Sequence, residues 1–170
     1  YSFIKGFIQP KYDNASLPVF TYESKMTISQ GNEEIELYNF GKAHTDGDSA
    51  VVFKNNNIIH TGDAFVRYGY PYVDLNNGGS IKGLINFLGT LELLCNDNTI
   101  IIPGHGGLSK KEDVTNLKNT LDDLYTKTII GLKNGLSYRE ISDSIDETLN
   151  GDTIVKLNYI KSIELELSRN

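Results

Sequence analysis

Short runs in the N-terminal part of the chain alternate apolar and polar positions, which is the pattern of half-buried β-strands. Residues 26–29 and 35–40 both alternate in this way, and the Gly-Asn pair at 31–32 is typical of a turn. These two runs predict a β-hairpin. An apolar run at 19–22 predicts one more strand, which follows an irregular lead-in over residues 1–18.

Two further apolar runs predict a second pair of strands. Residues 50–53 and 58–59 are separated by one lysine and three asparagines at 54–57, which is a clear turn signal. Because a tight turn joins these two strands, their outer ends should lie side by side. We therefore expect residues 19–63 to form a β-rich region.

The period of the apolar positions then becomes helical. Ser80 is a suitable N-cap, and the apolar residues after it recur at helical spacing, so we predict a helix over 80–94. A continuous apolar run, rich in β-branched residues, predicts a buried strand over 99–103.

Capping boxes, in which Ser or Thr is followed three residues later by Glu, mark the starts of two later helices. They are formed by Ser109 with Glu112 and by Ser137 with Glu140. With the periodic apolar positions that follow, they predict helices over residues 110–134, 138–150 and 152–168.

The composition is that of one globular domain spanning residues 1–170, with 39% apolar and 22% charged residues. A net charge of −6 without a basic stripe argues against nucleic acid as a partner. No apolar run is long enough to predict a membrane span, so we expect a soluble protein, cytoplasmic or periplasmic. The single cysteine, Cys95, excludes an internal disulfide and is predicted to be a buried core thiol.

Three potential metal ligands follow predicted strands or precede them in glycine-rich loops. His44 precedes the strand at 50–53, Asp63 follows the strand at 58–59, and His105 follows the strand at 99–103. The turn between the first two strands should make His44 and Asp63 neighbours. Each residue alone has a structural alternative, as a turn-capping or loop residue, but the three together predict a site.

The same residues carry a family resemblance. The motif G-x-x-H-T-x-G-D at residues 41–48, T-G-D at 61–63 and P-G-H-G at 103–106 resembles the C-terminal half of the metallo-β-lactamase fold hydrolases. The aromatic segment at 70–75 with the glycines that follow is similar to one bacterial branch of that superfamily. The resemblance covers roughly residues 17–149. It implies an α+β fold, the αββα sandwich, of which this chain would supply a mixed β-sheet covered by helices.

The resemblance also implies a dinuclear zinc centre. His44 would bind the first metal ion, His105 the second, and Asp63, the expected catalytic residue, would bridge them. Bound zinc lowers the pKa of a water molecule to about 7 and polarises the bond under attack. The implied activity is hydrolysis of an ester, thioester, lactam or phosphoester of a small-molecule substrate.

The family's other metal ligands come from an H-x-H-x-D-H motif, which this sequence lacks. Its only histidines are His44, His60 and His105. We therefore expect the chain to be the C-terminal half of such a domain, separated by truncation or cleavage or encoded as a half domain. Each metal position would keep two ligands at most, so we expect zinc binding by this chain alone to be weak or absent, and the chain alone to be inactive.

Residues around the candidate ligands have two interpretations each. Arg67, Tyr70 and Tyr72 either line a substrate pocket or cover the helix beneath them. Asp48 is either a turn former or an outer partner that orients His44. His60 should share a face of its strand with Ile58 and is predicted to be packed.

A half domain would leave one face of its sheet uncovered. Exposing apolar surface costs roughly 25 cal/mol per Å², so inward residues such as Val51, Phe53, Ile59 and Ile101 would need a partner. We expect that partner to be the missing N-terminal half or a second copy of the chain. Two other hypotheses remain open at this point: a non-catalytic half domain that serves binding or assembly, and an iron-dependent sulfur dioxygenase of the same fold.

Overall fold

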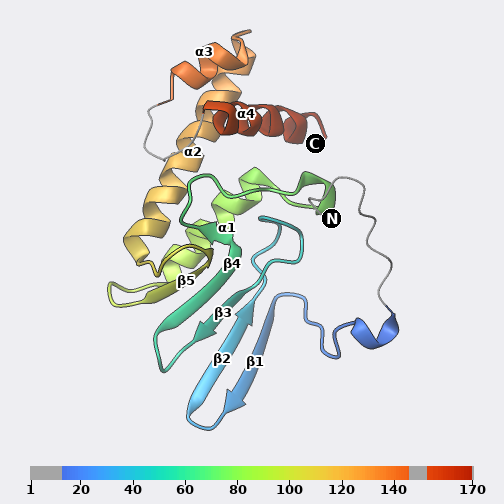
Figure 1. Cartoon of the computed structure of the whole chain (residues 1–170), viewed down its shortest axis with the longest axis vertical. Coiled ribbons are helices and arrows are strands. Elements are labelled where there is room, and N and C mark those ends of the chain that lie inside the picture. The colour runs from blue at the N-terminus through green and yellow to red at the C-terminus, as the bar shows by residue number, and fades with distance from the viewer. Residues whose placement is uncertain (1–12, 146–152, 170) are drawn as a thin grey trace.

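The computed structural model describes residues 13–145 and 153–169. Its centre is one mixed five-stranded sheet with the order β1-β2-β3-β4-β5 (Figure 1). The first four strands pair antiparallel, and β5 pairs parallel with β4. A 3₁₀ turn, η1, at Asn14–Ser16 precedes the strands, which are β1 (Lys25–Gln30), β2 (Glu33–Tyr38), β3 (Ala50–Phe53), β4 (Ile58–Val66) and β5 (Ile100–His105).

The predicted hairpin is formed by β1 and β2, with Met26 opposite Leu37 and Ile28 opposite Ile35. The strand predicted at 19–22 is wrong, because these residues are in irregular structure. Val19 is 89% exposed and Phe20 is 78% exposed. An apolar run becomes a strand only where a neighbouring strand and a packing surface are available, and residues 19–22 pair with no strand in the part of the chain that the structure describes.

Strand β4 is longer than predicted and continues to Val66. Asp63 therefore lies within the strand rather than after it, and Phe65, which lies beyond the predicted end of the strand, is buried in the core. The extension is paired: Val66 lies opposite His105 in β5, which also extends two residues beyond its predicted end. Parallel pairing between two distant segments, invisible in local patterning, causes both differences.

Four helices and a short 3₁₀ turn, η2, at Leu75–Asn77 accompany the sheet. Ser80 caps the first helix as predicted, because its side chain accepts a hydrogen bond from Gly83 N. The capping box at Ser109 is wrong, because the second helix starts later and the Asp113 carboxylate accepts from Lys110 N instead. The helices are α1 (Ile81–Leu94), α2 (Lys111–Lys133), α3 (Tyr138–Asp143) and α4 (Thr153–Ser168).

The helix predicted over 138–150 ends earlier, since α3 stops at Asp143. Residues 146–152, including the start of the last predicted helix, lie outside the described residues. The capping box of Ser137 with Glu140 is confirmed at the start of α3. None of the helices in the described ranges combines the length and apolarity needed to cross a membrane.

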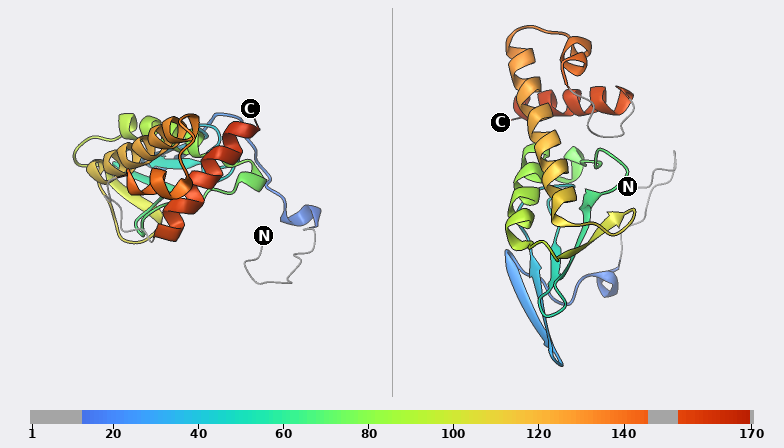
Figure 2. Two further views of the ribbon diagram at one scale, coloured as in Figure 1. Left: turned by 90° about the horizontal axis from the view of Figure 1, so that it is seen from above. Right: turned by 90° about the vertical axis from the view of Figure 1, so that its left-hand side faces the viewer.

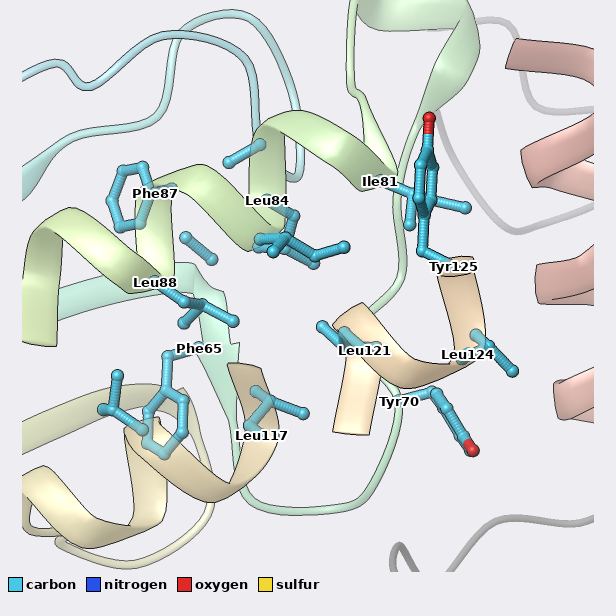
Figure 3. Packing of buried hydrophobic residues seen from close by; sticks show 14 of the residues in the cluster. Phe65, Tyr70, Ile81, Leu84, Phe87, Leu88, Leu117, Leu121, Leu124 and Tyr125 are labelled. Carbon is cyan, nitrogen blue, oxygen red and sulfur yellow. The ribbon is translucent and has the colours of Figure 1, made fainter. Parts of the chain in front are cut away.

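The main core lies between one face of the sheet and the helices α1 and α2 (Figure 2). Phe65 of β4, Leu88 of α1 and Leu117 of α2 belong to a single buried cluster (Figure 3). Cys95 is buried at its edge, and burial raises the pKa of its thiol to about 11, as expected for an unreactive core residue. A mixed sheet covered by helices confirms the α+β class.

The opposite side of the sheet carries apolar side chains from every strand, and we call it the open face. Val51 and Phe53 lie there as predicted, but Ile59 and Ile101 do not, because both are buried against the helices. The strands place their odd and even positions on opposite faces, and only the pairing register decides which set faces the helices. The open face consists of Met26, Ile28, Ile35, Leu37, Val51, Phe53, Ile58, His60, Ile100 and Ile102.

Several open-face side chains are accessible in the described structure. Ile28 and Ile100 are each 42% exposed. His60 shares this face with Ile58, as predicted, but it is exposed rather than packed. The prediction that His60 is a packed structural residue is therefore wrong for the described chain, because no element covers it.

Candidate metal centre

Asp63 is carried by β4 next to an irregularity in the sheet. The register between β4 and β5 shifts on both sides of Gly62, whose φ of 53° is in the left-handed region. Glycine adopts this conformation without the steric cost that a side chain would add, and bulges of this kind redirect the next side chain. The irregular backbone thus turns Asp63 toward the edge where β5 ends.

His44 lies in the loop before β3, and this loop is held by backbone hydrogen bonds to a second loop. Asp74 N donates to His44 O at 2.8 Å, and Ser80 N donates to Ala43 O at 2.9 Å. The Asp48 carboxylate accepts from Thr45 N at 2.8 Å, so Asp48 forms the turn and orients the loop through Thr45. Asp48 therefore acts as the turn former that the sequence offered as one of two interpretations.

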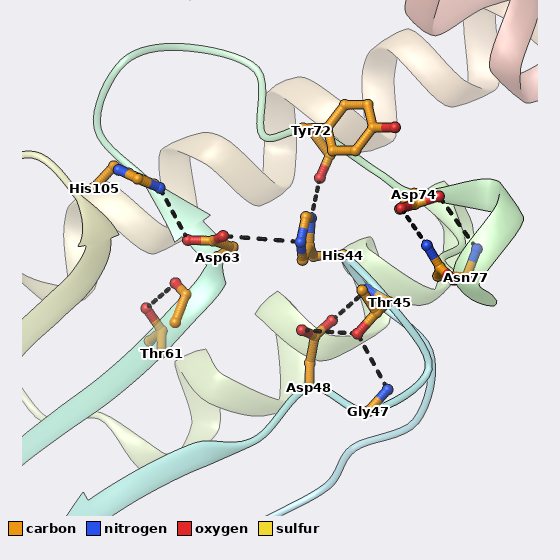
Figure 4. A network of polar contacts seen from close by, with 11 residues as sticks. His44, Thr45, Gly47, Asp48, Thr61, Asp63, Tyr72, Asp74, Asn77 and His105 are labelled. Atoms are coloured by element: carbon orange, nitrogen blue, oxygen red, sulfur yellow. Dashed lines mark hydrogen bonds and ion pairs between the residues drawn. The ribbon is translucent and has the colours of Figure 1, made fainter. Parts of the chain in front are cut away.

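The structure brings the three predicted ligands together (Figure 4). His44 Nε2 is 3.8 Å from Asp63 Oδ2, and His105 Nε2 is 3.3 Å from Asp63 Oδ1. Each carboxylate oxygen thus faces one imidazole, and the two histidines approach from different sides. The expected proximity of His44 and Asp63 at the outer ends of β3 and β4 is confirmed.

A backbone carbonyl determines which nitrogen of His44 is available. His44 Nδ1 is 2.7 Å from Tyr72 O. A carbonyl oxygen only accepts hydrogen bonds, so Nδ1 carries the proton and donates it. Nε2, which faces Asp63, is then the nitrogen that remains to bind a metal ion.

A glycine also makes room for Asp63 on the side of β5. A Cβ atom built on Gly104 would lie 2.2 Å from Asp63 Oδ1, so any larger residue would displace the carboxylate. His105 follows directly, and its carbonyl accepts from Arg67 N at 3.0 Å. The P-G-H-G motif therefore supplies both the imidazole and the space in which the carboxylate fits.

The sequence predicts that Arg67, Tyr70 and Tyr72 either line a substrate pocket or cover a helix, and Tyr72 packs its ring against a candidate ligand. Its ring meets that of His44 edge to face with centroids 5.9 Å apart. Arg67 is paired with the Asp113 carboxylate at the start of α2, and Tyr70 is buried.

Tyr68 was missed by the sequence reasoning, although its ring lies 5.7 Å from that of His105. Its position in an aromatic segment that follows a ligand was the one available signal, and a segment without a period does not indicate which rings turn toward the site.

The donor set fits half of a dinuclear centre. Each of two metal positions would receive one imidazole nitrogen and one carboxylate oxygen, both of which zinc and iron accept. Three protein ligands are usual for a catalytic zinc. Within residues 13–145 and 153–169, no group of three or more His, Cys, Asp and Glu side chains is arranged to hold one ion.

Comparisons with solved structures identify the fold. The stereoselective inverting sec-alkylsulfatase from Pseudomonas sp. matches 86% of this chain with a TM-score of 0.65 and 12% sequence identity. A metallo-beta-lactamase from Pontibacter korlensis matches 65% of this chain with a TM-score of 0.55 and 17% identity. These similarities show that the chain has the metallo-β-lactamase fold.

The chain spans only part of those proteins, 26% of the sulfatase and 52% of the lactamase. No family model matches the sequence, and no curated protein matches it. The family resemblance of the motifs is therefore supported by the shared fold and by the closeness of His44, Asp63 and His105.

Proposed function

We propose that this chain, with its metallo-β-lactamase fold, contributes three ligands to the metal centre of a metal-dependent hydrolase. The observation that carries the proposal is the paired geometry at Asp63, whose two oxygens each face the Nε2 atom of a different histidine. His44 and His105 would each hold one metal ion, and Asp63 would bridge them. We propose zinc as the metal, because two imidazoles and a carboxylate suit it.

The chain's own residues prepare this centre in two ways. Tyr72 O holds the proton of His44 on Nδ1 and so keeps Nε2 free. The Asp63 side chain is 43% exposed and can be reached by a small-molecule substrate. When bound, metal ions of this type polarise the reacting group and make hydroxide available near neutral pH. The proposed reaction is hydrolysis of an ester, thioester, lactam or phosphoester.

We further propose that the remaining ligands come from polypeptide that covers the open face. The fold named above places a second sheet against the first, and the apolar residues of the open face suit such packing. On its own, the chain offers two donors per metal ion. We therefore expect it to bind zinc weakly and to lack hydrolytic activity until it is completed.

The metal-binding part of this proposal is tested by titrating Zn²⁺ into the 170-residue chain while following its histidine side chains by NMR. The chain contains three histidines, and His60, on the open face, serves as an internal control. We expect the resonances of His44 and His105 to respond together, with an affinity weakened by the incomplete ligand set.

Asp63→Ala should abolish both responses, because it removes the oxygen that each position needs. Asp97→Ala, which removes an exposed acid elsewhere, should leave them unchanged. An equal response of all three histidines, or no response at millimolar zinc, would contradict the proposed centre. Inductively coupled plasma mass spectrometry should find little zinc in the purified wild-type chain.

A further inference from the structure

A pocket of about 290 Å³ lies between the loop that follows β4 and helix α4. Tyr68, Tyr72 and Val73 line it from the loop, and Val155 and Tyr159 line it from α4. The volume is near the lower end of small-ligand sites. All of these residues belong to the described chain, so the pocket does not depend on a further polypeptide for its walls.

The pocket shares two of its walls with the candidate metal centre. The ring of Tyr72 packs against His44, and the ring of Tyr68 packs against His105. The backbone carbonyl of Tyr72 also accepts a hydrogen bond from His44 Nδ1. The rings of Tyr68 and Tyr72 therefore lie between the pocket and the two imidazoles, so the pocket adjoins the candidate metal centre.

Hydrogen bonding and aromatic packing hold the pocket open in advance. The hydroxyl of Tyr159, which is buried, donates to Pro71 O and ties the loop to α4. The rings of Tyr70 and Tyr159 lie 5.1 Å apart. Burial raises the pKa of Tyr159 above its ordinary range, so its hydroxyl remains a donor. A preformed pocket binds without a cost for ordering its walls.

The chemistry of the walls selects against charge. None of the described residues that line the pocket is charged. Arg67, the nearest basic residue in the loop sequence, is turned to Asp113 at the start of α2. A carboxylate or phosphate entering the pocket would lose its hydration without gaining a cation, which is costly. Apart from the neutral polar side chains of Asn158 and Ser162, the described walls are aromatic and apolar, and they favour a neutral ring or a short alkyl group.

We propose that this pocket binds a neutral, apolar substituent of the substrate, an aryl or short alkyl group, and so places the hydrolysable bond beside His44, Asp63 and His105. The proposal rests on the function proposed above for those three residues. It restricts the substrate class to esters, thioesters, lactams or phosphoesters that carry such a group, and it makes Val155 and Tyr72 specificity-determining residues.

Direct binding to the metal-free chain tests the pocket separately from the chemistry. The probe is acetanilide, a neutral aryl amide, and binding is followed by backbone amide shifts in NMR. We expect millimolar binding, with shifts confined to residues 68–73 and to α4. Benzoate, which carries the same ring and a negative charge, should bind at least about tenfold more weakly.

Val155→Asp introduces a charge at the pocket wall and should weaken acetanilide binding by about tenfold or more. Ile154→Asp makes the same change one residue earlier on α4, outside the pocket, and should change binding by less than about twofold. Val155 is 37% exposed and Ile154 is 63% exposed, so both variants should fold, which far-UV circular dichroism verifies.

The proposal is overturned if acetanilide fails to bind, if benzoate binds equally well, or if Val155→Asp and Ile154→Asp behave alike. These outcomes are independent of the zinc titration, because no metal is present. If the chain binds acetanilide but not zinc, the pocket is supported and the proposed metal centre is contradicted. If it binds zinc but not acetanilide, the metal centre is supported and the pocket is contradicted.

Discussion

Two acidic residues illustrate how differently single side chains are used in this molecule. Asp63 is placed at an irregular point of β4 and accommodated by Gly104, so that its oxygens face two imidazoles rather than cations. Glu36 is buried on β2 and fully partnered, with Lys25 Nζ and the Tyr38 hydroxyl each 2.6 Å from its carboxylate. Asp63 is available to a ligand, whereas Glu36 stabilises the fold.

The stability of the protein should depend on the charge of Glu36. Hydrogen bonds from Lys25 and Tyr38 hold the pKa of Glu36 at about 2, below its ordinary value of 4.5. A depressed carboxyl pKa contributes stability that is complete above about pH 4.5 and is lost as the pH falls toward 2. Because Lys25 is half exposed, we expect Glu36→Gln to cost only about 1 kcal/mol at pH 7.

Urea unfolding of the wild type and Glu36→Gln at pH 7 and at pH 2 measures this effect. The difference in unfolding free energy should shrink at the lower pH. Glu34→Gln is the matched control on the same strand, because Glu34 forms only an exposed pair with Lys54 and should cost little at either pH. An undiminished difference between Glu36→Gln and the wild type at pH 2 would contradict the assigned ionisation.

At the scale of elements, the site depends on contacts between segments that are distant in sequence. The loop after β4 is held on one side by α4, through Tyr159 and Pro71, and on the other by His44, through Tyr72 O. Helix α4 also reaches the start of α1, where the Glu166 carboxylate accepts from Ser80 Oγ at 2.7 Å and from Ile81 N at 2.8 Å. The last helix therefore stabilises both the loop and the helix that borders the site.

A double-mutant cycle between Ser80 and Glu166 measures this link. Glu166→Gln removes a charge-assisted partner from the N-terminus of α1, and Ser80→Ala removes the local cap, so each should cost about 1 kcal/mol of unfolding free energy. Because Ser80 donates to Glu166, the double variant should cost less than the sum by about 0.5 kcal/mol or more. Strictly additive costs in chemical denaturation would mean that the two residues act separately.

At the scale of the whole molecule, the two faces of the sheet differ in how far they are buried. Helices α1 and α2 bury one face, while the open face keeps a continuous set of apolar residues accessible. Exposed apolar patches of this kind mark sites of association. The asymmetry follows from the strand register, which directs Ile59 and Ile101 toward the helices and Val51 and Phe53 toward the open face.

The isolated chain should therefore self-associate through the open face. In sedimentation velocity we expect species larger than one 18.9 kDa chain at micromolar concentration, and Phe53→Lys should shift the distribution toward the monomer. Leu93→Lys, which changes an 85% exposed residue of α1 away from this face, is the control and should have no effect. A monodisperse wild-type monomer would contradict the assignment of the open face as an interface.

Much of the candidate site was predictable because its signals are local. Strand alternation and the asparagine-rich turn before Ile58 placed His44 and Asp63 together, and the motif around His105 added the third ligand. The extension of β4 through Phe65 and the role of Tyr68 were not predictable. Both depend on which distant segment packs against these residues. The apolar positions in this region have neither a helical nor a strand period, so the sequence does not indicate that packing.

The sequence by itself determined the hairpin of β1 and β2, the helices α1 and α2 and the closeness of His44 and Asp63. These follow from periodicity, capping and turn chemistry, which act between residues close in the chain. The α+β class was implied by the family resemblance of the motifs around His44, Asp63 and His105. Only the tertiary structure decided that Ile59 and Ile101 face the helices while Val51 and Phe53 face outward, and that Tyr72 O orients His44. Such choices depend on strand register and on packing between distant segments, whose energies arise only when the chain has folded.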